Sequence, residues 1–427
     1  MSIKTWFQNQ RDHFKVLTKI ERRLLISFFL FALASPIIWT FMNTFLWRID
    51  QDPVLLIIFN VGFYAALPLG FFLNALLLRW TDAPVLYVVG CILQGAVPLI
   101  LVSLGDRAAD LILWLGVALG IAGGFFWANR NYLTSKVTTG AHRFYFLSME
   151  NAFNTAASIV APISIGWMLT LGERFALYSV EGAYRFAAIM AFIALCAAGL
   201  AVYKAGLERC DQQLNQYVLR KAGNIWNALR KMEFLNGFVD GIEVIIPVVI
   251  ILTFLGAEET VGTIETLSSV VSAILLVIIS KHVTHKSHYA ILLLWMIGSL
   301  IGGLTFAALF TSAGALIYFT INAFVGTFRW SSLATIMYEV VDQFSARGIT
   351  HRFVYIMDRE VFLGLGRLSA LGVVYLLYTS IPEASIRFGL LLIVVAQLIL
   401  LLIIRPILKQ ILHERMPVDI IPNEPAP

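Results

Sequence analysis

Apolar runs of about 20 residues or more follow one another along almost the whole chain, separated by short polar segments. A run of this length crosses the hydrocarbon core of a bilayer as a helix, whereas a membrane β-barrel would show short segments of alternating polarity. The pattern therefore predicts an all-α membrane protein with twelve transmembrane helices. The predicted spans are residues 24–47, 54–78, 84–104, 110–133, 144–170, 179–203, 232–254, 259–281, 288–310, 313–340, 352–380 and 385–412.

The composition agrees with this prediction. Of the 427 residues, 59% are hydrophobic and 13% are charged, which is about half the charged share of a soluble domain. So few charges do not cover a water-soluble surface, so we expect the lipid bilayer to be the solvent of this chain. The first apolar run begins near Leu24 behind a basic amphipathic segment, and we expect it to stay as the first span rather than to be cleaved.

Basic residues are unevenly distributed over the polar segments. If the N-terminus is cytoplasmic, most Lys and Arg lie on the inner side, and the outer segments hold only Arg48, Arg107, Arg174, Arg185 and Arg387. This asymmetry predicts cytoplasmic termini and an even number of spans, in a multi-pass protein of the bacterial inner membrane. It also accounts for the net charge of +5 without a nucleic-acid partner.

The longest polar connection falls between the sixth and seventh spans and divides the chain into halves. Its apolar residues alternate with basic ones, as in a helix that lies on the inner membrane face. The predicted organisation is an amphipathic lead (1–23), a six-helix bundle (24–203), the central loop (204–231), a second six-helix bundle (232–412) and a cytoplasmic tail (413–427).

A short repeat relates the two halves. The triplet His-Arg-Phe enters span 5 at residues 142–144 and span 11 at residues 351–353. Span 4 ends near Arg130, and span 10 contains Arg329, each close to a tryptophan. Equivalent placement indicates a duplication, with two parallel six-span halves related by an axis along the membrane normal.

With this layout, the chain resembles the major facilitator superfamily over essentially its whole length. The resemblance implies two pseudo-symmetric six-helix bundles, a solute site near the midplane between the halves, and a rocking motion that exposes the site to one side at a time. One family signature is degenerate, because Asn74 stands roughly where an aspartate is expected between spans 2 and 3, and the loop 280–286 lacks the signature too. The resemblance is therefore to a divergent branch.

Ionisable residues inside spans are costly and mark candidate sites. Arg130 and Glu150 should lie at similar depth in spans 4 and 5 and form a pair, with Asn154 on the stripe of Glu150. A purely structural ion pair is the alternative.

In span 11, Glu360 and Arg367 share a helix face, whereas Asp358 points elsewhere. Arg329 of span 10 should reach a similar depth, and two guanidinium groups would attract a carboxylate or phosphate. The alternative is that Glu360 neutralises these arginines in a locked network.

Asp240 and Glu243 of span 7 fall on one stripe with Asn236. Burial favours the neutral form of a carboxyl group, so these two residues and Glu150 are candidates for proton coupling, with Glu265 in second rank. Asp240 at the border of an inner vestibule is the alternative.

Further candidates for solute contact are Asn43, Trp127 and Trp330, although aromatic residues in spans more often serve packing. The cysteines have no pairing pattern and the histidines are scattered among loops and span ends. We therefore expect no disulfide framework, metal or cofactor.

Three classes of function are open to a polytopic membrane protein of this kind: a transporter, an enzyme and a sensor. A membrane enzyme would need convergent ligands at one membrane face, and a sensor would usually carry a soluble output domain. The sequence favours a non-enzymatic secondary active transporter, expected to be monomeric, that moves a small polar and preferably anionic solute by alternating access with proton coupling. An efflux carrier or flippase for amphiphilic compounds is the alternative, and the solute and the direction of transport stay open.

Overall fold

The computed structural model is helical wherever a regular element is described. It describes residues 17–138, 140–204, 223–256, 258–279, 288–326, 329, 332–337, 340–341 and 352–414. Within this part of the chain, no strand occurs. Residues 1–16 of the amphipathic lead, most of the central loop and the tail after Glu414 lie outside the described residues.

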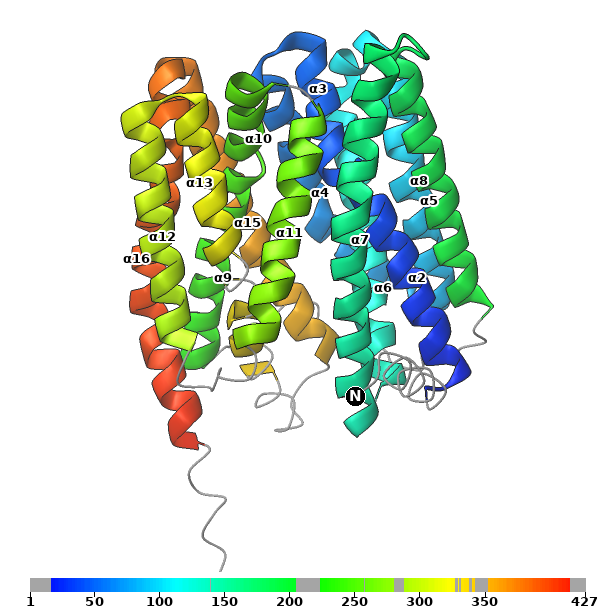
Figure 1. Ribbon diagram of the computed structural model, residues 1–427. Helices are drawn as coiled ribbons and strands as arrows, with labels where there is room; N and C mark the ends of the chain where they lie inside the picture. Colours follow the sequence, from blue (N-terminus) through cyan, green and yellow to red (C-terminus); the bar gives the residue numbers. More distant parts are fainter. Residues whose placement is uncertain are drawn as a thin grey trace, which may run out of the picture. The chain divides into compact units, whose positions relative to one another are not determined.

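The helices follow the predicted spans in order (Figure 1). The first six spans are α2 (Lys19–Pro36) with η1 (Ile37–Phe41) and α3 (Met42–Asp50), then α4 (Pro53–Leu77), α5 (Ala83–Leu104), a short η2 (Gly105–Leu111), α6 (Ile112–Val137), α7 (Gly140–Arg174) and α8 (Val180–Tyr203). The later helices are α9 (Asn224–Glu243), α10 (Ile246–Ile250), η3 (Ile251–Leu255), α11 (Glu258–Ile279), α12 (His288–Leu309), α13 (Ser312–Val325), α15 (Arg352–Ser380) and α16 (Pro382–Glu414).

Nine helices within the described residues are long and apolar enough to cross a membrane. One of them, residues 83–134, contains both α5 and α6 and so supplies two of the predicted spans. The tenth predicted span, 313–340, is described only in part, and its helix α13 ends at Val325. The prediction of an all-α, multi-pass membrane protein is confirmed.

Polar side chains set where several helices begin. The Thr18 hydroxyl accepts a hydrogen bond from the Glu21 amide (3.2 Å), and the Glu21 carboxylate accepts one from the Thr18 amide (2.7 Å). This capping box starts α2 five residues before the predicted span at 24. Asp52 caps α4 in the same way through the Val54 amide (2.9 Å).

Span 7 is not continuous. We predicted one span over 232–254, but α9 ends at Glu243 and α10 begins at Ile246 after a two-residue turn. Pro247 has no N–H to bond the carbonyl four residues earlier, so the helix loses a hydrogen bond at this turn. The interruption therefore directly follows the last of the acidic residues of span 7.

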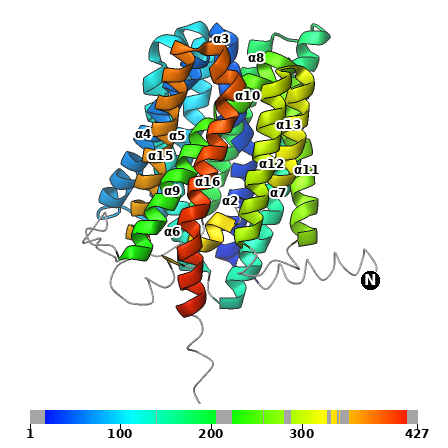
Figure 2. The same ribbon diagram turned by 90° about the vertical axis from the view of Figure 1, so that its left-hand side faces the viewer.

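The chain forms two compact units. Unit 1 consists of Met1–Tyr217 and Val244–Val270, and unit 2 consists of Val218–Glu243 and Val271–Pro427. Within unit 1, α2 packs against α7 and α8, and α5 packs against α6 and α8. Within unit 2, α9 packs against α15 and α16, and α12 packs against α13 and α16 (Figure 2).

Glycines allow the closest helix contacts in both units. In unit 1, a Cβ atom on Gly116 or Gly120 of α6 would collide with backbone oxygens of α4. In unit 2, a Cβ atom on Gly237 of α9 would meet the Leu363 oxygen, and one on Gly366 of α15 would meet the Phe234 oxygen. The backbones of α9 and α15 therefore touch, which brings the polar side chains that flank this contact within reach of one another.

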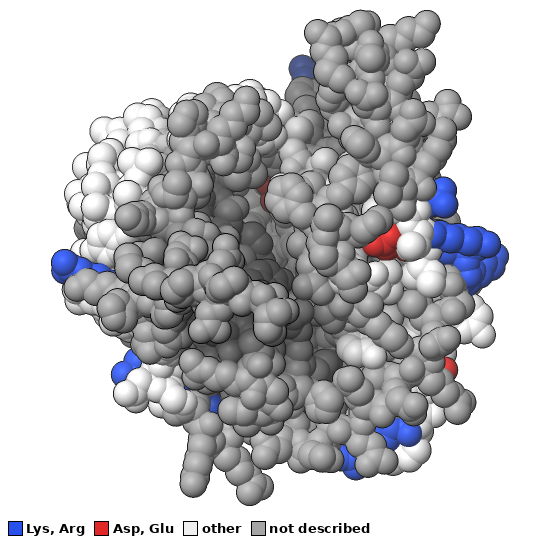
Figure 3. Space-filling model, turned by 90° about the horizontal axis from the view of Figure 1, so that it is seen from below, with Lys and Arg blue, Asp and Glu red and all other residues white. Residues whose placement is uncertain are grey.

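Basic residues concentrate at one end of each unit. In unit 1, Arg22, Arg79 and Lys204 lie where α2 begins and where α4 and α8 end. In unit 2, Arg230 lies in the first turns of α9, and Arg405 lies in the last part of α16. Figure 3 views the lower face of Figure 1, on which Lys and Arg side chains occur at several places. The predicted cytoplasmic side is the side of these ends.

Replacing Gly366 by Val is expected to lower the thermal unfolding temperature of the purified protein strongly, because a side chain there forces α15 away from the backbone of α9. Gly372→Val is the matched control on the same helix, since Gly372 is exposed and a Cβ atom there meets nothing within 4 Å. Equal unfolding temperatures for the two variants would contradict this account of the α9 and α15 contact.

Candidate functional site

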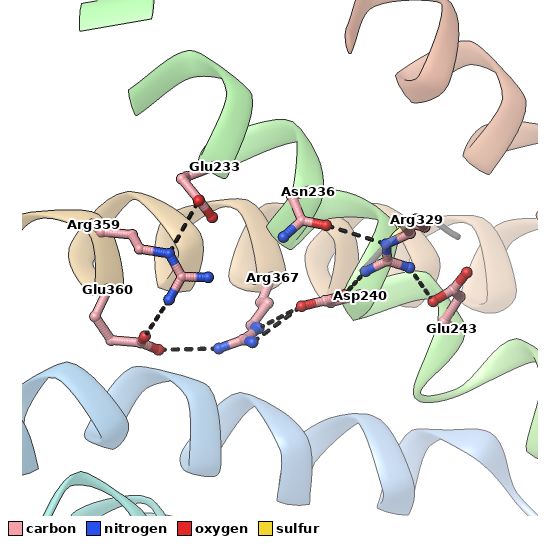
Figure 4. Close-up of polar contacts among 8 residues, drawn as sticks. All are labelled: Glu233, Asn236, Asp240, Glu243, Arg329, Arg359, Glu360 and Arg367. Carbon is pink, nitrogen blue, oxygen red and sulfur yellow. Dashed lines mark hydrogen bonds and ion pairs between the residues drawn. The ribbon is translucent and has the colours of Figure 1, made fainter. Parts of the chain in front are cut away.

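Eight polar residues of unit 2 form one connected group, here called the charged cluster (Figure 4). Four of them lie on α9, three lie on α15, and Arg329 lies between α13 and α15 in the sequence. The members are Glu233, Asn236, Asp240, Glu243, Arg329, Arg359, Glu360 and Arg367.

Helical spacing places these side chains on facing rows. On α9, the polar positions recur at intervals of three or four residues from Glu233 to Glu243, so they line one face. On α15, Glu360 and Arg367 are seven residues apart, which is close to two full turns. The glycine contacts between the helices lie beside these rows, so each row reaches the other.

Asp240 bridges two arginines. One oxygen of its carboxylate forms an ion pair with Arg329. The other oxygen accepts hydrogen bonds from Arg367, from Nη2 at 3.0 Å and from Nε at 3.3 Å. The prediction that Arg329 reaches the depth of Arg367 is confirmed, because both guanidinium groups bond the same carboxylate.

Arg329 is held on several sides. Besides Asp240, it forms an ion pair with Glu243 and donates from Nε to the Asn236 side-chain oxygen at 3.2 Å. Its guanidinium carbon lies 5.5 Å from the centre of the Trp295 ring, a cation–π contact. The residue is 7% exposed, so these partners replace most of its water.

Arg367 continues the cluster towards the start of α15. Its Nη1 donates to Glu360 at 3.1 Å, which confirms that these two residues share a face. The other oxygen of Glu360 lies 3.8 Å from Arg359, and Nε of Arg359 lies 3.0 Å from Glu233. Glu360 therefore neutralises Arg367, and Asp240 neutralises Arg367 and Arg329 together.

Glu233 and Arg359 were missed as candidates. Glu233 lies three residues before Asn236 and seven before Asp240, so its place on the same stripe was readable from the sequence. The position of Arg359 was not, because its neighbours Asp358 and Glu360 face different groups. Only the packing of α15 on α9 decides which of the two faces Arg359 joins.

Asp358 does point away from Glu360, as predicted. It is fully buried and accepts hydrogen bonds at 2.7 Å from Trp226 Nε1 and from Nε and Nη2 of Arg230. This bidentate pair joins α9 to α15 near the beginning of both helices. Asp358 thus has the contacts of a structural residue.

Asp358→Asn should destabilise the protein by about 3–5 kcal/mol, since it leaves the Arg230 charge largely buried without its counter-ion. The measurement is the midpoint of thermal unfolding in detergent. The double variant Asp358→Asn/Arg230→Met should recover part of the loss, because it removes both charges. A double variant that is no more stable than the single one would contradict a paired role.

The predicted pair in unit 1 is also present. Arg130 of α6 forms an ion pair with Glu150 of α7, and its guanidinium carbon lies 4.7 Å from the Phe28 ring and 4.8 Å from the Trp127 ring. The structure therefore brings three candidates, Arg130, Glu150 and Trp127, into one aromatic surrounding.

The remaining candidates lie elsewhere or are not described. Asn154 is half-buried on α7. The Asn43 side chain donates to the Trp39 carbonyl and accepts from Asn60, both at 3.0 Å, so it joins α3 to α4. Trp330 and the side chains of both His-Arg-Phe triplets lie outside the described residues.

Asn74, at the degenerate family signature, has a neutral partner. The Asn129 amide donates to the Asn74 side-chain oxygen at 2.6 Å, and the Asn74 amide returns a contact at 3.4 Å. Both residues are fully buried. A reciprocal amide pair between α4 and α6 thus occupies the position where the resemblance leads one to expect a charge.

No group of His, Cys, Asp or Glu side chains within the described residues has the arrangement of a metal site. The chemistry that the charged cluster offers is therefore ion pairing, anion binding by guanidinium groups and proton binding by carboxyl groups.

Comparisons with known proteins address the fold. No family model matches the chain. A Bacillus subtilis protein named "Uncharacterized protein YqgE" is 24% identical over 342 residues, which cover 79% of this chain and 78% of that protein. The solved structure of the nucleoside transporter NupG matches with a TM-score of 0.62 at 12% identity, over 91% of this chain and 99% of NupG. The fucose:proton symporter FucP of E. coli matches with a TM-score of 0.58 at 12% identity, over 91% and 98% of the two chains.

The chain has the major facilitator fold. The resemblance drawn from the layout of the spans is therefore confirmed for the fold. Proteins with the major facilitator fold in this comparison act on a nucleoside in one case and on fucose in the other. The major facilitator fold alone does not identify the solute, so the function depends on what the charged cluster can bind.

Proposed function

We propose that the chain is a secondary active transporter that moves a small anionic solute together with a proton by alternating access. In this proposal the charged cluster binds both. It is supported by a fold shared with NupG and FucP, the latter named a proton symporter. The protein would act as a monomer in a bacterial inner membrane with both termini in the cytoplasm.

The observation that carries the proposal is the position of Asp240 between Arg329 and Arg367. A carboxylate held by two guanidinium groups occupies the place that a solute carboxylate or phosphate would take. When Asp240 is protonated, its charge is lost and its hold on both arginines weakens. Protonation would therefore open the two arginines to a solute anion.

Charge balance fixes the expected coupling. An uncompensated charge at this depth is costly, so the loaded and empty states should carry the same net charge. A monovalent anion would then enter with one proton. Glu360 and Glu243, which pair with the outer sides of Arg367 and Arg329, would keep the arginines in place while the solute exchanges with Asp240.

The second charged locus is assigned a supporting role. Glu150 paired with Arg130 is a second candidate for proton coupling, and Trp127, Asn154 and Asn43 are candidates for solute contact in unit 1. Protonation that differs between the two access states would bias which side opens.

An efflux carrier or flippase for amphiphilic compounds is the second candidate function. The aromatic rings of Phe28 and Trp127 around the Arg130 charge favour it, because an amphiphile presents an apolar body and a charged head. In that case a membrane-soluble ligand, rather than a small organic anion, should stabilise the protein.

A thermal-shift screen of the purified protein tests the proposal, with organic anions, sugar phosphates, peptides and amphiphiles as separate classes. We expect an organic anion or sugar phosphate to raise the unfolding temperature of the wild type, and to have no effect on Arg367→Gln. The solute that does so is then tested for uptake into proteoliposomes. Stabilisation by amphiphiles alone would overturn the anion proposal.

A further inference from the structure

The seven ionisable residues of the charged cluster form a chain of ion pairs, here called the ion-pair chain, in which acids and bases alternate (Figure 4). Each arginine lies between two carboxyl groups, and the middle two carboxyl groups each lie between two arginines. Both ends of the chain are acids. The order is Glu233, Arg359, Glu360, Arg367, Asp240, Arg329 and Glu243.

The ion-pair chain holds four carboxyl groups and three guanidinium groups, so these seven residues carry one formal negative charge when all are ionised. A net charge among groups this buried is unfavourable, and one bound proton removes it. Wherever that proton sits, the remaining three carboxylates still match the three arginines one to one. When the neutral position shifts from one acid to the next, the arginine between them changes partner.

Glu233 is the more buried end of the ion-pair chain, here called its deep end. It is 1% exposed, one oxygen lies 3.0 Å from Arg359, and the other oxygen has no hydrogen-bond partner. A buried carboxylate oxygen without a partner is costly, whereas a protonated carboxyl group tolerates this surrounding better.

Among the side chains that the structure describes, the other charged groups of the neighbouring helices do not compensate Glu233. On α9 and α15, Arg230 and Asp358 pair with each other, and Lys231 is exposed. On α16, Glu383 and Arg405 are exposed, and Arg387 donates to the Ala307 carbonyl. Of the charged side chains described on these helices, Arg359 is the one in an ion pair with Glu233.

Glu243 is the open end. Its side chain is 31% exposed, the largest fraction among the four acids of the ion-pair chain. It lies at the end of α9, where span 7 is interrupted. The partial negative charge at a helix C-terminus also favours a neutral carboxyl group. Ten helical residues separate it from Glu233, so the ends lie about 15 Å apart along α9, roughly half the thickness of the hydrocarbon core.

We propose that the ion-pair chain is a proton relay, with Glu243 as its open terminus and Glu233 as its deep terminus. A proton from water binds to the Glu243 carboxylate, and Arg329, Arg367 and Arg359 each turn by one partner towards Glu233. The proton held by Glu233 then passes to water that reaches the first half of α9 in the other access state of the proposed alternating-access cycle. One proton is gained and one is lost, and the arginines stay charged throughout. The proposal rests on the proposed proton coupling, to which it adds the path and Glu233.

Infrared spectroscopy of the protein in liposomes without any solute tests the relay. The carbonyl stretching band of protonated carboxyl groups is measured at neutral pH and calibrated against the same sample at low pH. Glu233→Gln and Glu243→Gln each leave three acids for three arginines, so each should lose the intensity of one carboxyl group. Glu181→Gln, an exposed acid of unit 1, should lose none.

Breaking the chain gives the opposite result. Arg367→Gln separates the relay into two segments, each with two acids and one arginine, so the band should gain the intensity of one carboxyl group. Arg359→Gln should give the same gain and replaces it if Arg367→Gln does not fold. If the band is unchanged in Glu243→Gln, or does not grow in either arginine variant, the protonation is local and the relay is wrong.

This outcome is separable from the proposed transport, because the spectra are recorded without solute. Absence of uptake together with the expected band changes would refute the carrier proposal and leave the relay. Proton-driven uptake together with unchanged bands would refute the relay alone.

Discussion

Arg367→Gln is expected to reduce solute uptake into proteoliposomes, per amount of folded protein, by at least about a hundredfold. A hydrogen bond to a charged group is worth about 1.5–3 kcal/mol, and the guanidinium group would offer a solute anion two of them. Each 1.4 kcal/mol is about a factor of ten. Arg329→Gln should also reduce uptake strongly, since Asp240 pairs with both arginines.

The matched control is Arg107→Gln, which removes an exposed arginine in the 3₁₀-helix η2 of unit 1. Its uptake should equal that of the wild type. Folding is checked by size-exclusion elution and by the thermal unfolding midpoint of each variant. Uptake at the parental rate by folded Arg367→Gln and Arg329→Gln proteins would show that these arginines do not bind the solute.

Asp240→Asn is expected to abolish accumulation driven by a pH gradient while exchange of solute across the membrane continues. The amide of Asn has nearly the shape of a protonated carboxyl group, and it cannot ionise. The arginines would thus stay open to the anion at every pH. In the wild type, an acidic outside should drive uptake, because the proton enters with the solute.

Asp110→Asn, an exposed acid in η2, is the control for this variant and should keep the full response to the gradient. The measurement is solute uptake with and without a pH gradient, followed by counterflow with equal pH on both sides. A variant Asp240→Asn that still accumulates solute in response to the gradient would exclude Asp240 as the coupling residue.

The helical segments that the structure describes were predictable because span length is set by membrane thickness, which apolar runs report directly. Stripes of polar residues on one helix were also predictable, because the period of a helix is fixed. The pairing of Arg130 with Glu150 followed from their depth and is confirmed. The shared face of Glu360 and Arg367 followed from their spacing on one helix, and their ion pair is the alternative in which Glu360 neutralises the arginine.

The register between different helices could not be predicted from the sequence. The bridge from Asp240 to both Arg329 and Arg367 depends on how far α9 slides along α15. Contacts at Gly237 and Gly366 set that distance, and nothing in the local pattern of either helix states which backbone atom each glycine meets. The arginines with Glu360 and the acids of span 7 are therefore predicted as separate groups, a solute site and a proton-coupling site, whereas the structure joins them.

The interruption of span 7 was missed for another reason. Hydropathy averages over a window and is blind to hydrogen bonding, so the apolar run through Pro247 was read as one helix. The missing N–H of that residue was visible in the sequence, two turns after Asp240. In the structure, α9 ends at Glu243, and this residue is the open end of the ion-pair chain.

Simultaneous recording of solute uptake and internal pH in proteoliposomes tests the central claim most directly. The charged cluster is proposed to carry a monovalent anion and a proton together at unchanged net charge. The expected result is one proton per solute, a rate independent of the membrane potential, and loss of the proton movement in Asp240→Asn. Solute entry without proton movement in the wild type, or a rate set by the membrane potential, would contradict it.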